Sequence, residues 1–312
     1  MNWLKKYHWE LLFAICLLFF YFLVLGNNLV YVDNYLYIDG IVEQYPERFS
    51  LPLFYFVGLV GYWLMGDISF YILPLGFFFT SYYLMVRLFK KFHYNTSLII
   101  LSFAIAPLFS ESVWFFMRDS LFFMLATFFA YYFFKSVKSH AFFWKQLAVT
   151  SILMVLTRDF SIVFIFMFIC LWIQKYENKM GAVSLGGLIN PDWLTNWFNN
   201  WIAGTRQLFN LKRITFMSLF PNPLWFISIY SLIRKPSWMH AILIMVSVLT
   251  SLSIANMGFD NSTLFRYTFS TFPLHLFFIA NAEKEEKHRW TYMVLYAPIV
   301  IPAILFWKLG HF

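Results

Sequence analysis

Charged residues are scarce in this chain of 312 residues: only 12% are Asp, Glu, Lys or Arg, whereas 61% are hydrophobic. Because ordinary globular domains carry about 25% charged residues, the composition excludes a water-soluble domain. The long apolar runs also lack the alternation of barrel strands, which favours helices. A helix needs about 20 apolar residues to cross a hydrocarbon core. We therefore predict an all-α, polytopic helical membrane protein.

Cysteine and the short motifs of soluble nucleotide enzymes are lacking too. Cys16 and Cys170 lie in apolar runs and give neither a disulfide framework nor a metal-binding spacing. No glycine-rich phosphate loop, nucleophile elbow or metal-binding histidine pair occurs. His240 and His275 have no partner at ligand spacing, so we expect them to pack in the core or at the interface. We predict no metal-ligand set and disfavour a soluble nucleotide enzyme.

Positive charge is in excess, with a net charge of +8 at pH 7. In a soluble protein this would suggest a nucleic-acid partner. Here the basic residues instead cluster in short loops between apolar segments, which is the pattern of cytosolic loops in membrane proteins. The clusters are Lys5-Lys6, Lys90-Lys91, Lys135 with Lys138, Arg234-Lys235 and Lys284 to Arg289. We infer membrane topology, and no nucleic acid, from this charge.

The apolar segments predict about nine or ten crossings within a single transmembrane domain, residues 1–312. Residues 27–50, after the first crossing, form an external acidic loop, and residues 51–65 are either a half-helix or a surface helix. Residues 190–209 read as an interfacial amphipathic helix, because tryptophans recur every four residues there. The expected crossings are 9–26, 70–88, 96–109, 112–134, 146–174, 216–233, 238–256, 264–280 and 290–307.

The segment 146–174 has two readings, because Thr157-Arg158-Asp159 interrupts its apolar run. It is either one long, broken crossing or two short helices that meet at Arg158. The single crossing would place residues 174–213 outside. The later segments would then alternate consistently between inward and outward crossings. Both readings stay open at this point.

Ionisable residues inside or beside membrane segments are costly and usually functional. The topology brings such residues from distant parts of the chain to the external face: Asp33, Glu111, Arg118-Asp119, Arg158 if the segment breaks at Thr157, and Arg266. Arginine suits a phosphate, because guanidinium offers bidentate donors, and a carboxylate can act as general base toward a hydroxyl. An activated sugar carried on a lipid phosphate fits such a site. The alternative without a catalytic role is that Arg118 pairs with Asp119 and Arg158 pairs with Asp159, so that each pair of neighbours is neutral.

The order of these motifs resembles the GT-C superfamily of integral-membrane glycosyltransferases, in particular the branch of protein O-mannosyltransferases and lipid A aminoarabinose transferases. The likeness covers roughly residues 9–175, then the region of Arg266. It departs at Asn34, where that branch has an acid, and in lacking the large C-terminal soluble domain of some relatives. The matching segments are Asp33-Asn34-Tyr35-Leu36-Tyr37, Leu51-Pro52-Leu53-Phe54-Tyr55 through Gly66, Met85 to Lys91, Arg118-Asp119, Thr157-Arg158, and Arg266-Tyr267 with Pro273.

The resemblance implies transfer of a sugar from a polyprenyl-phosphate donor to a hydroxyl of a lipid, glycan or protein, with inversion, at the external face. Asp33 would be the general base, and Asp119 would orient the acceptor or tune Asp33. It allows for a divalent metal ion, because some relatives use one and others do not. The membrane would be the plasma (inner) membrane, or the endoplasmic reticulum in a eukaryote. Substrate-binding residues would be Tyr37, Glu111, Arg118, Arg158, Arg266 and Tyr267.

Two other functions are compatible with the same residues. In a membrane transporter or lipid flippase the charges would line a pathway, although such proteins favour charges near the midplane and internal repeats, and no repeat is visible here. A non-catalytic subunit of a membrane glycosylation complex would carry a degenerate site. Asn34 and the small size of the chain favour this alternative.

Overall fold

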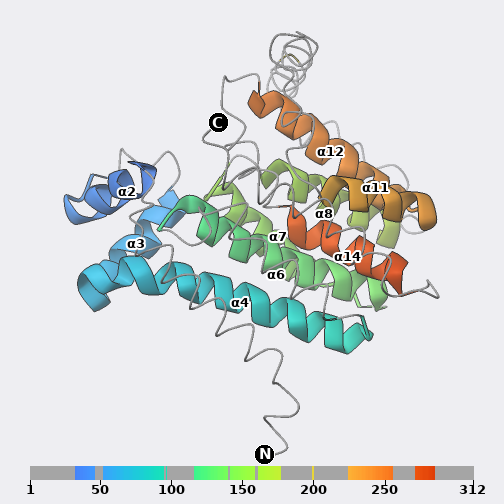
Figure 1. Ribbon diagram of the computed structural model, residues 1–312, viewed down its shortest axis with the longest axis horizontal. Helices are drawn as coiled ribbons and strands as arrows, with labels where there is room; N and C mark the ends of the chain where they lie inside the picture. The colour runs from blue at the N-terminus through green and yellow to red at the C-terminus, as the bar shows by residue number, and fades with distance from the viewer. Residues whose placement is uncertain are drawn as a thin grey trace, which may run out of the picture. The chain divides into compact units, whose positions relative to one another are not determined.

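The fold is seen in a computed structural model, which describes residues 32–45, 52–94, 116–139, 141–158, 161–176, 224–255 and 271–284, and positions 96 and 199. All regular elements in these ranges are helices, which confirms the all-α prediction there (Figure 1). The elements are α2 (Val32–Val42), α3 (Pro52–Met65), the short 3₁₀ helix η2 (Gly66–Ile68), α4 (Ser69–Phe92), α6 (Arg118–Lys138), α7 (Trp144–Val155), α8 (Ile162–Tyr176), α11 (Leu224–Arg234), α12 (Trp238–Ala255) and α14 (Phe272–Glu283).

The contacts divide the chain into two compact units, which are described separately. The first comprises Met1–Leu125 and Leu156–Arg158, and the second comprises Ala126–Val155 and Asp159–Phe312. The first unit therefore holds α2, α3, α4 and the start of α6. The second holds the rest of α6 and the helices that follow it.

In the first unit, the chain reverses between α3 and α4, and the two helices pack on each other beside the turn (Figure 1). Gly66 opens η2 with a φ of 63°, a left-handed conformation that glycine adopts without steric cost. The rings of Tyr62 and Phe70 stack across the turn with their centroids 5.6 Å apart. α3 begins with Pro52, which suits a first helical position because its missing N–H would have no partner there.

The segment predicted as an external acidic loop contains a helix, α2, over Val32–Val42. Packing explains the difference. Tyr37 and Ile41 are four residues apart, so they share one helix face. Tyr37 meets the ring of Phe54 on α3 at a centroid distance of 5.6 Å, and Ile41 is fully buried against Gly58. A short helix that is marginal alone is stabilised by such burial.

In the second unit, the segment 146–174 forms two antiparallel helices, so the single-crossing reading is wrong and the two-helix reading is confirmed. Aromatic contacts join the beginning of α7 to the end of α8: Phe142 lies 5.6 Å from Trp172 and 5.7 Å from Tyr176, between ring centroids. The Lys175 ammonium donates to the carbonyl of Ser139, just after α6. The chain therefore breaks around Arg158 and returns to the basic end of α6.

The remaining helices of the second unit pack through apolar side chains. α11 lies against α14, and α12 lies against α8 (Figure 1). Phe134 of α6 stacks on Phe277 of α14 with 3.5 Å between ring centroids, and Lys138 donates to Asn281 at 2.6 Å. The C-terminal ends of α6 and α14 therefore meet.

Two helical stretches are long and apolar enough to cross a membrane: Pro52–Phe92, with 41 residues, and Arg118–Lys138, with 21 residues. The most apolar window of the first is only 22% buried, against 72% for the second. The exposed side chains of the first include Phe56, Trp63, Leu64 and Tyr83. The expectation of nine or ten crossings goes beyond this finding and stays a prediction, as does the single domain.

Candidate functional site

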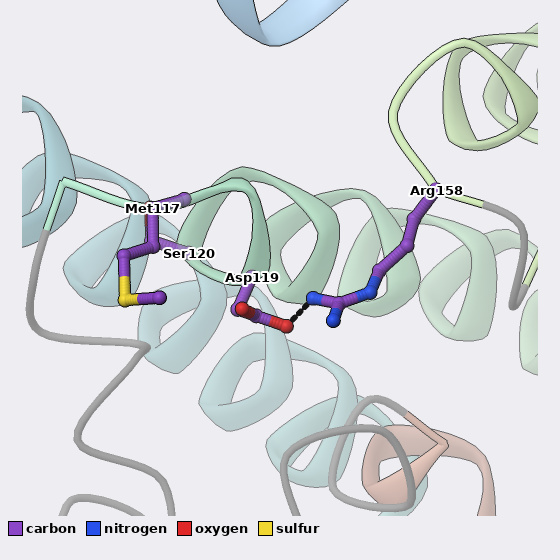
Figure 2. Close-up of polar contacts among 4 residues, drawn as sticks. All are labelled: Met117, Asp119, Ser120 and Arg158. Atoms are coloured by element: carbon purple, nitrogen blue, oxygen red, sulfur yellow. Dashed lines mark hydrogen bonds and ion pairs between the residues drawn. The ribbon is translucent and has the colours of Figure 1, made fainter. Parts of the chain in front are cut away.

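The most deeply buried charges predicted for the site form an ion pair. Asp119 is the second residue of α6, and Arg158 follows the end of α7 by three residues. A guanidinium nitrogen (Nη1) of Arg158 contacts Oδ1 of Asp119, and the two side chains are only 6% and 7% exposed. Figure 2 shows the Arg158 side chain extended toward the carboxylate. Because an isolated buried charge is costly, each partner makes burial of the other tolerable.

The first turn of α6 fixes the position of Asp119. Ser120 donates its backbone N–H and its hydroxyl to the carbonyl of Met117, at 3.1 and 2.7 Å. Met117 and Ser120 are both fully buried beside the pair (Figure 2). A carboxylate in the first helical turn also interacts favourably with the partial positive charge of the helix N-terminus. Asp119 is therefore held by its helix as well as by Arg158.

Arg118, the neighbour of Asp119, contacts an aromatic cluster instead. Its guanidinium carbon lies 5.6 Å from the centroid of the Tyr37 ring, within the range of a cation–π interaction. Tyr37 packs on Phe54, and the Phe54 ring lies 4.7 Å from that of Phe116. Phe116 in turn meets Phe70 at 4.9 Å. The cluster joins α2, α3, α4 and the residues before α6, and Arg118 remains half-buried at its edge.

Two further contacts position these elements. The backbone N–H of Leu53, at the start of α3, donates to the carbonyl of Leu156 at 3.2 Å, which ties the segment bearing Arg158 to α3. At Gly58 an added Cβ would lie 2.6 Å from Phe116 and 2.9 Å from Ile41. A glycine at this position lets α2 and the residues before α6 approach α3 closely.

The pairing differs from the one that the sequence suggested. Arg118 and Asp119 are neighbours in the chain, but Asp119 pairs with Arg158 and Arg118 stacks on Tyr37. Adjacent residues on a helix point in directions about 100° apart, so they rarely face each other. The structure thus brings together four predicted site residues: Tyr37, Arg118, Asp119 and Arg158.

The side chains of the other predicted site residues are not among the described ones. The backbone of Asp33 belongs to α2, one helical turn before Tyr37, but its side chain is not among the described ones. Glu111, Arg266 and Tyr267 fall in ranges that are not described, as does the predicted interfacial helix of residues 190–209, apart from position 199.

Sequence reasoning missed a buried polar network in the second unit. It joins Ser228 of α11 to His240 of α12 and His275 of α14, with Ser228 Oγ 2.7 Å from His240 Nε2 and 2.8 Å from His275 Nδ1. Ser247 Oγ lies 3.3 Å from His275 Nε2. Large sequence separations hid the network. The sequence did carry one signal of it, which is the presence of polar residues within apolar segments. His240 and Ser247, for example, are seven residues apart and therefore share one face of a helix.

Among the described residues, no group of three or more His, Cys, Asp and Glu side chains is arranged to hold a metal ion. Comparison with protein-family models gives no match, and comparisons with curated proteins and with solved structures give no significant match. The functional argument therefore depends on the residues themselves.

Proposed function

We propose that the chain is a membrane glycosyltransferase that moves a sugar from a polyprenyl-phosphate donor to a hydroxyl acceptor at the external membrane face. Asp33 removes the hydroxyl proton, the hydroxyl oxygen attacks the anomeric carbon with inversion, and the polyprenyl phosphate leaves. The acceptor is a lipid, glycan or protein. Since phosphate is a good leaving group, the reaction needs no strong general acid.

One observation supports this proposal most: three segments far apart in the chain supply charged and aromatic groups to one unit. Tyr37 comes from α2, Arg118 and Asp119 from the start of α6, and Arg158 from the break after α7. Asp33 stands one helical turn before Tyr37 in α2. This chemistry requires a carboxylate that removes the proton of the acceptor hydroxyl and cations that bind the phosphate of the donor.

The two arginines differ in what they can offer a phosphate. Arg158 is buried and engaged with Asp119, so its main role in this proposal is to fix the position of Asp119. Arg118 is half-buried, and its guanidinium carbon lies 5.6 Å from the centroid of the Tyr37 ring. Because a guanidinium held on a ring keeps its forked N–H donors in fixed directions, Arg118 is the better candidate for the donor phosphate.

The apolar exterior supports a lipid-linked substrate. α3 and α4 expose the large apolar side chains of Phe56, Trp63, Leu64 and Tyr83, and exposed apolar side chains of this size suit contact with lipid tails. α3 also packs on α2 and reaches the Tyr37–Phe54 contact. A prenyl chain lying along α3 would therefore end near Arg118, where the phosphate is proposed to bind.

The test is a transfer assay in membranes that contain the full-length chain, with polyprenyl-phosphate hexoses and pentoses radiolabelled in the sugar. The variant Asp33→Asn should lower the rate by about 100-fold or more, the usual contribution of a general base. The matched control is Asp39→Asn on the exposed side of the same helix, which should retain the wild-type rate. If Asp33→Asn transfers sugar at the wild-type rate, Asp33 is not the general base.

A second candidate, a transporter, is favoured by the buried polar network of the second unit. Ser228, His240, Ser247 and His275 are all fully buried within apolar helices. Polar and ionisable groups at such positions commonly mark ion or proton pathways. A transporter would leave donor sugar unreacted, so the same assay separates the two functions.

A further inference from the structure

The buried network of the second unit is a continuous chain of hydrogen-bonding atoms. It runs from His240 through Ser228 and His275 to Ser247, and each link joins two different helices among α11, α12 and α14. A serine hydroxyl carries one hydrogen, and a neutral imidazole carries a hydrogen on only one of its two nitrogens. The hydrogens of the four groups are therefore not independent.

The link at Ser228 has the strictest requirement. Its oxygen is within hydrogen-bond distance of two ring nitrogens, His240 Nε2 and His275 Nδ1. With both rings neutral, Ser228 donates to one nitrogen and accepts from the other. Two arrangements satisfy all three links: in one every hydrogen points toward His240, and in the other every hydrogen points toward Ser247. The chain can reverse its direction without losing a hydrogen bond.

One added proton also fits without breaking a link. If His275 carries it, both ring nitrogens donate, one to Ser228 and one to Ser247, while Ser228 donates to His240. If His240 carries it, Nε2 donates to Ser228, which donates to His275. A second added proton would place two charges on rings whose centroids are only 6.4 Å apart in a buried site, where like charges repel strongly.

We propose that Ser228, His240, Ser247 and His275 form a proton relay that can take up one proton and pass it between the two imidazoles. Because burial disfavours the charged form of each ring, the pair is neutral near neutral pH and takes up the proton under acidic conditions. The transfer is balanced. The Nε2–H bond of His240 breaks as an O–H bond forms on Ser228, while the original O–H of Ser228 breaks and an Nδ1–H bond forms on His275. The added proton comes from bulk water and returns to it.

Within the network, His240 lies nearest to the start of its helix. His240 lies in the first turn of α12, directly after the loop that contains exposed Pro236. Its ring stacks on Phe278 with 4.5 Å between centroids, and the face of an aromatic ring carries negative potential that favours a charged imidazole. Ser247 lies two turns further along α12, about 10 Å away along the axis.

Two charged groups on the surrounding helices, Arg234 and Lys138, form hydrogen bonds with residues outside the network. The Arg234 guanidinium donates to Tyr230 at 3.1 Å, and Lys138 donates to Asn281 at 2.6 Å. Neither contact involves the histidines. The titratable and charged side chains on the described helices that pack around the network are Tyr230 and Arg234 of α11, Glu283 of α14, Cys170, Lys175 and Tyr176 of α8, and Tyr131, Tyr132, Lys135 and Lys138 of α6.

The experiment is a pH titration of imidazole ¹⁵N resonances in the full-length chain, labelled at histidine and held in lipid nanodiscs. The variants His240→Gln and His275→Gln assign the two signals. In the wild type the pair should take up one proton, with both rings reporting it. Removing either ring should shift the midpoint of the other by about 1 pH unit or more, the mark of coupled groups.

Ser228→Ala should leave the repulsion between the charged rings in place but stop the exchange of tautomers and fix each ring in a single tautomer, whereas Ser228→Thr should behave as the wild type because it keeps the hydroxyl. Ser231→Ala is the matched control, since Ser231 is also buried in α11 but donates to the Ile227 carbonyl at 2.7 Å. It should titrate as the wild type does. Independent titration in the wild type, or exchange between two tautomers that persists in Ser228→Ala, would overturn the proposal. No sugar donor is present, so the outcome does not depend on the proposed transferase.

Discussion

Asp119 and Arg158 are buried charged residues that form an ion pair with each other. Both are buried, so each charge needs the other. Removing one partner of a buried pair leaves an uncompensated charge, which usually costs about 3–5 kcal/mol. Replacing both by apolar side chains of similar size removes the charges together and is often nearly neutral. The pair is therefore open to a double-mutant test.

We predict that Asp119→Leu and Arg158→Met each destabilise the protein by about 3–5 kcal/mol, whereas the double variant loses much less than the sum. Stability is measured by denaturant unfolding of the detergent-solubilised chain. Additive losses would show that the two side chains do not interact. If the double variant is stable yet inactive in sugar transfer, the pair contributes to the reaction as well as to the fold.

At the scale of the elements, the approach of α2 and the start of α6 to α3 depends on Gly58. An alanine there gains helix propensity but crowds Phe116 and Ile41, whereas Gly76 of α4 has nothing within 4 Å of an added Cβ. The same substitution at the two positions therefore separates helix propensity from crowding.

We predict that Gly76→Ala stabilises the protein by up to about 1 kcal/mol, and that Gly58→Ala is about 1–3 kcal/mol less stable than Gly76→Ala, because overpacking offsets the gain. Thermal unfolding followed by the loss of monodisperse protein gives the comparison. Equal effects at the two positions would argue against the close packing of α2 on α3.

The sequence predicted the helices themselves well, because apolar runs of membrane length leave few alternatives. Starts and ends near Ser69, Trp238 and Ala255 came within a residue or two of expectation. It predicted α2 poorly, since that helix depends on the contact of Tyr37 with Phe54, which is invisible in a local pattern. It named Arg118, Asp119 and Arg158 correctly as unusual but could not pair them, because pairing is set by packing between helices.

At the scale of the whole chain, the antiparallel α7 and α8 change the expected topology. The end of α8 returns to the basic end of α6, as the bond from Lys175 to Ser139 requires. We therefore predict that residues at the two ends of the α7–α8 segment face the same side of the membrane. A single crossing would place them on opposite sides.

Cysteine labelling tests this topology. In a background with Cys16 and Cys170 changed to alanine, we predict that Ser139→Cys and Gln174→Cys, both exposed positions, react with a membrane-impermeant maleimide from the same side of sealed vesicles. Labelling of the two cysteines from opposite sides would contradict the hairpin and restore the single crossing.

The central claim is that this chain alone transfers sugar from a polyprenyl phosphate. The most direct measurement uses the purified chain in liposomes, with a radiolabelled polyprenyl-phosphate sugar and a membrane extract as acceptor source. We predict turnover by the wild type, a product with inverted anomeric configuration by NMR, and loss of turnover in Asp33→Asn but not in Asp39→Asn. Turnover that appears only when a second membrane polypeptide is added, and that persists with Asp33→Asn, would show that the catalytic site lies elsewhere.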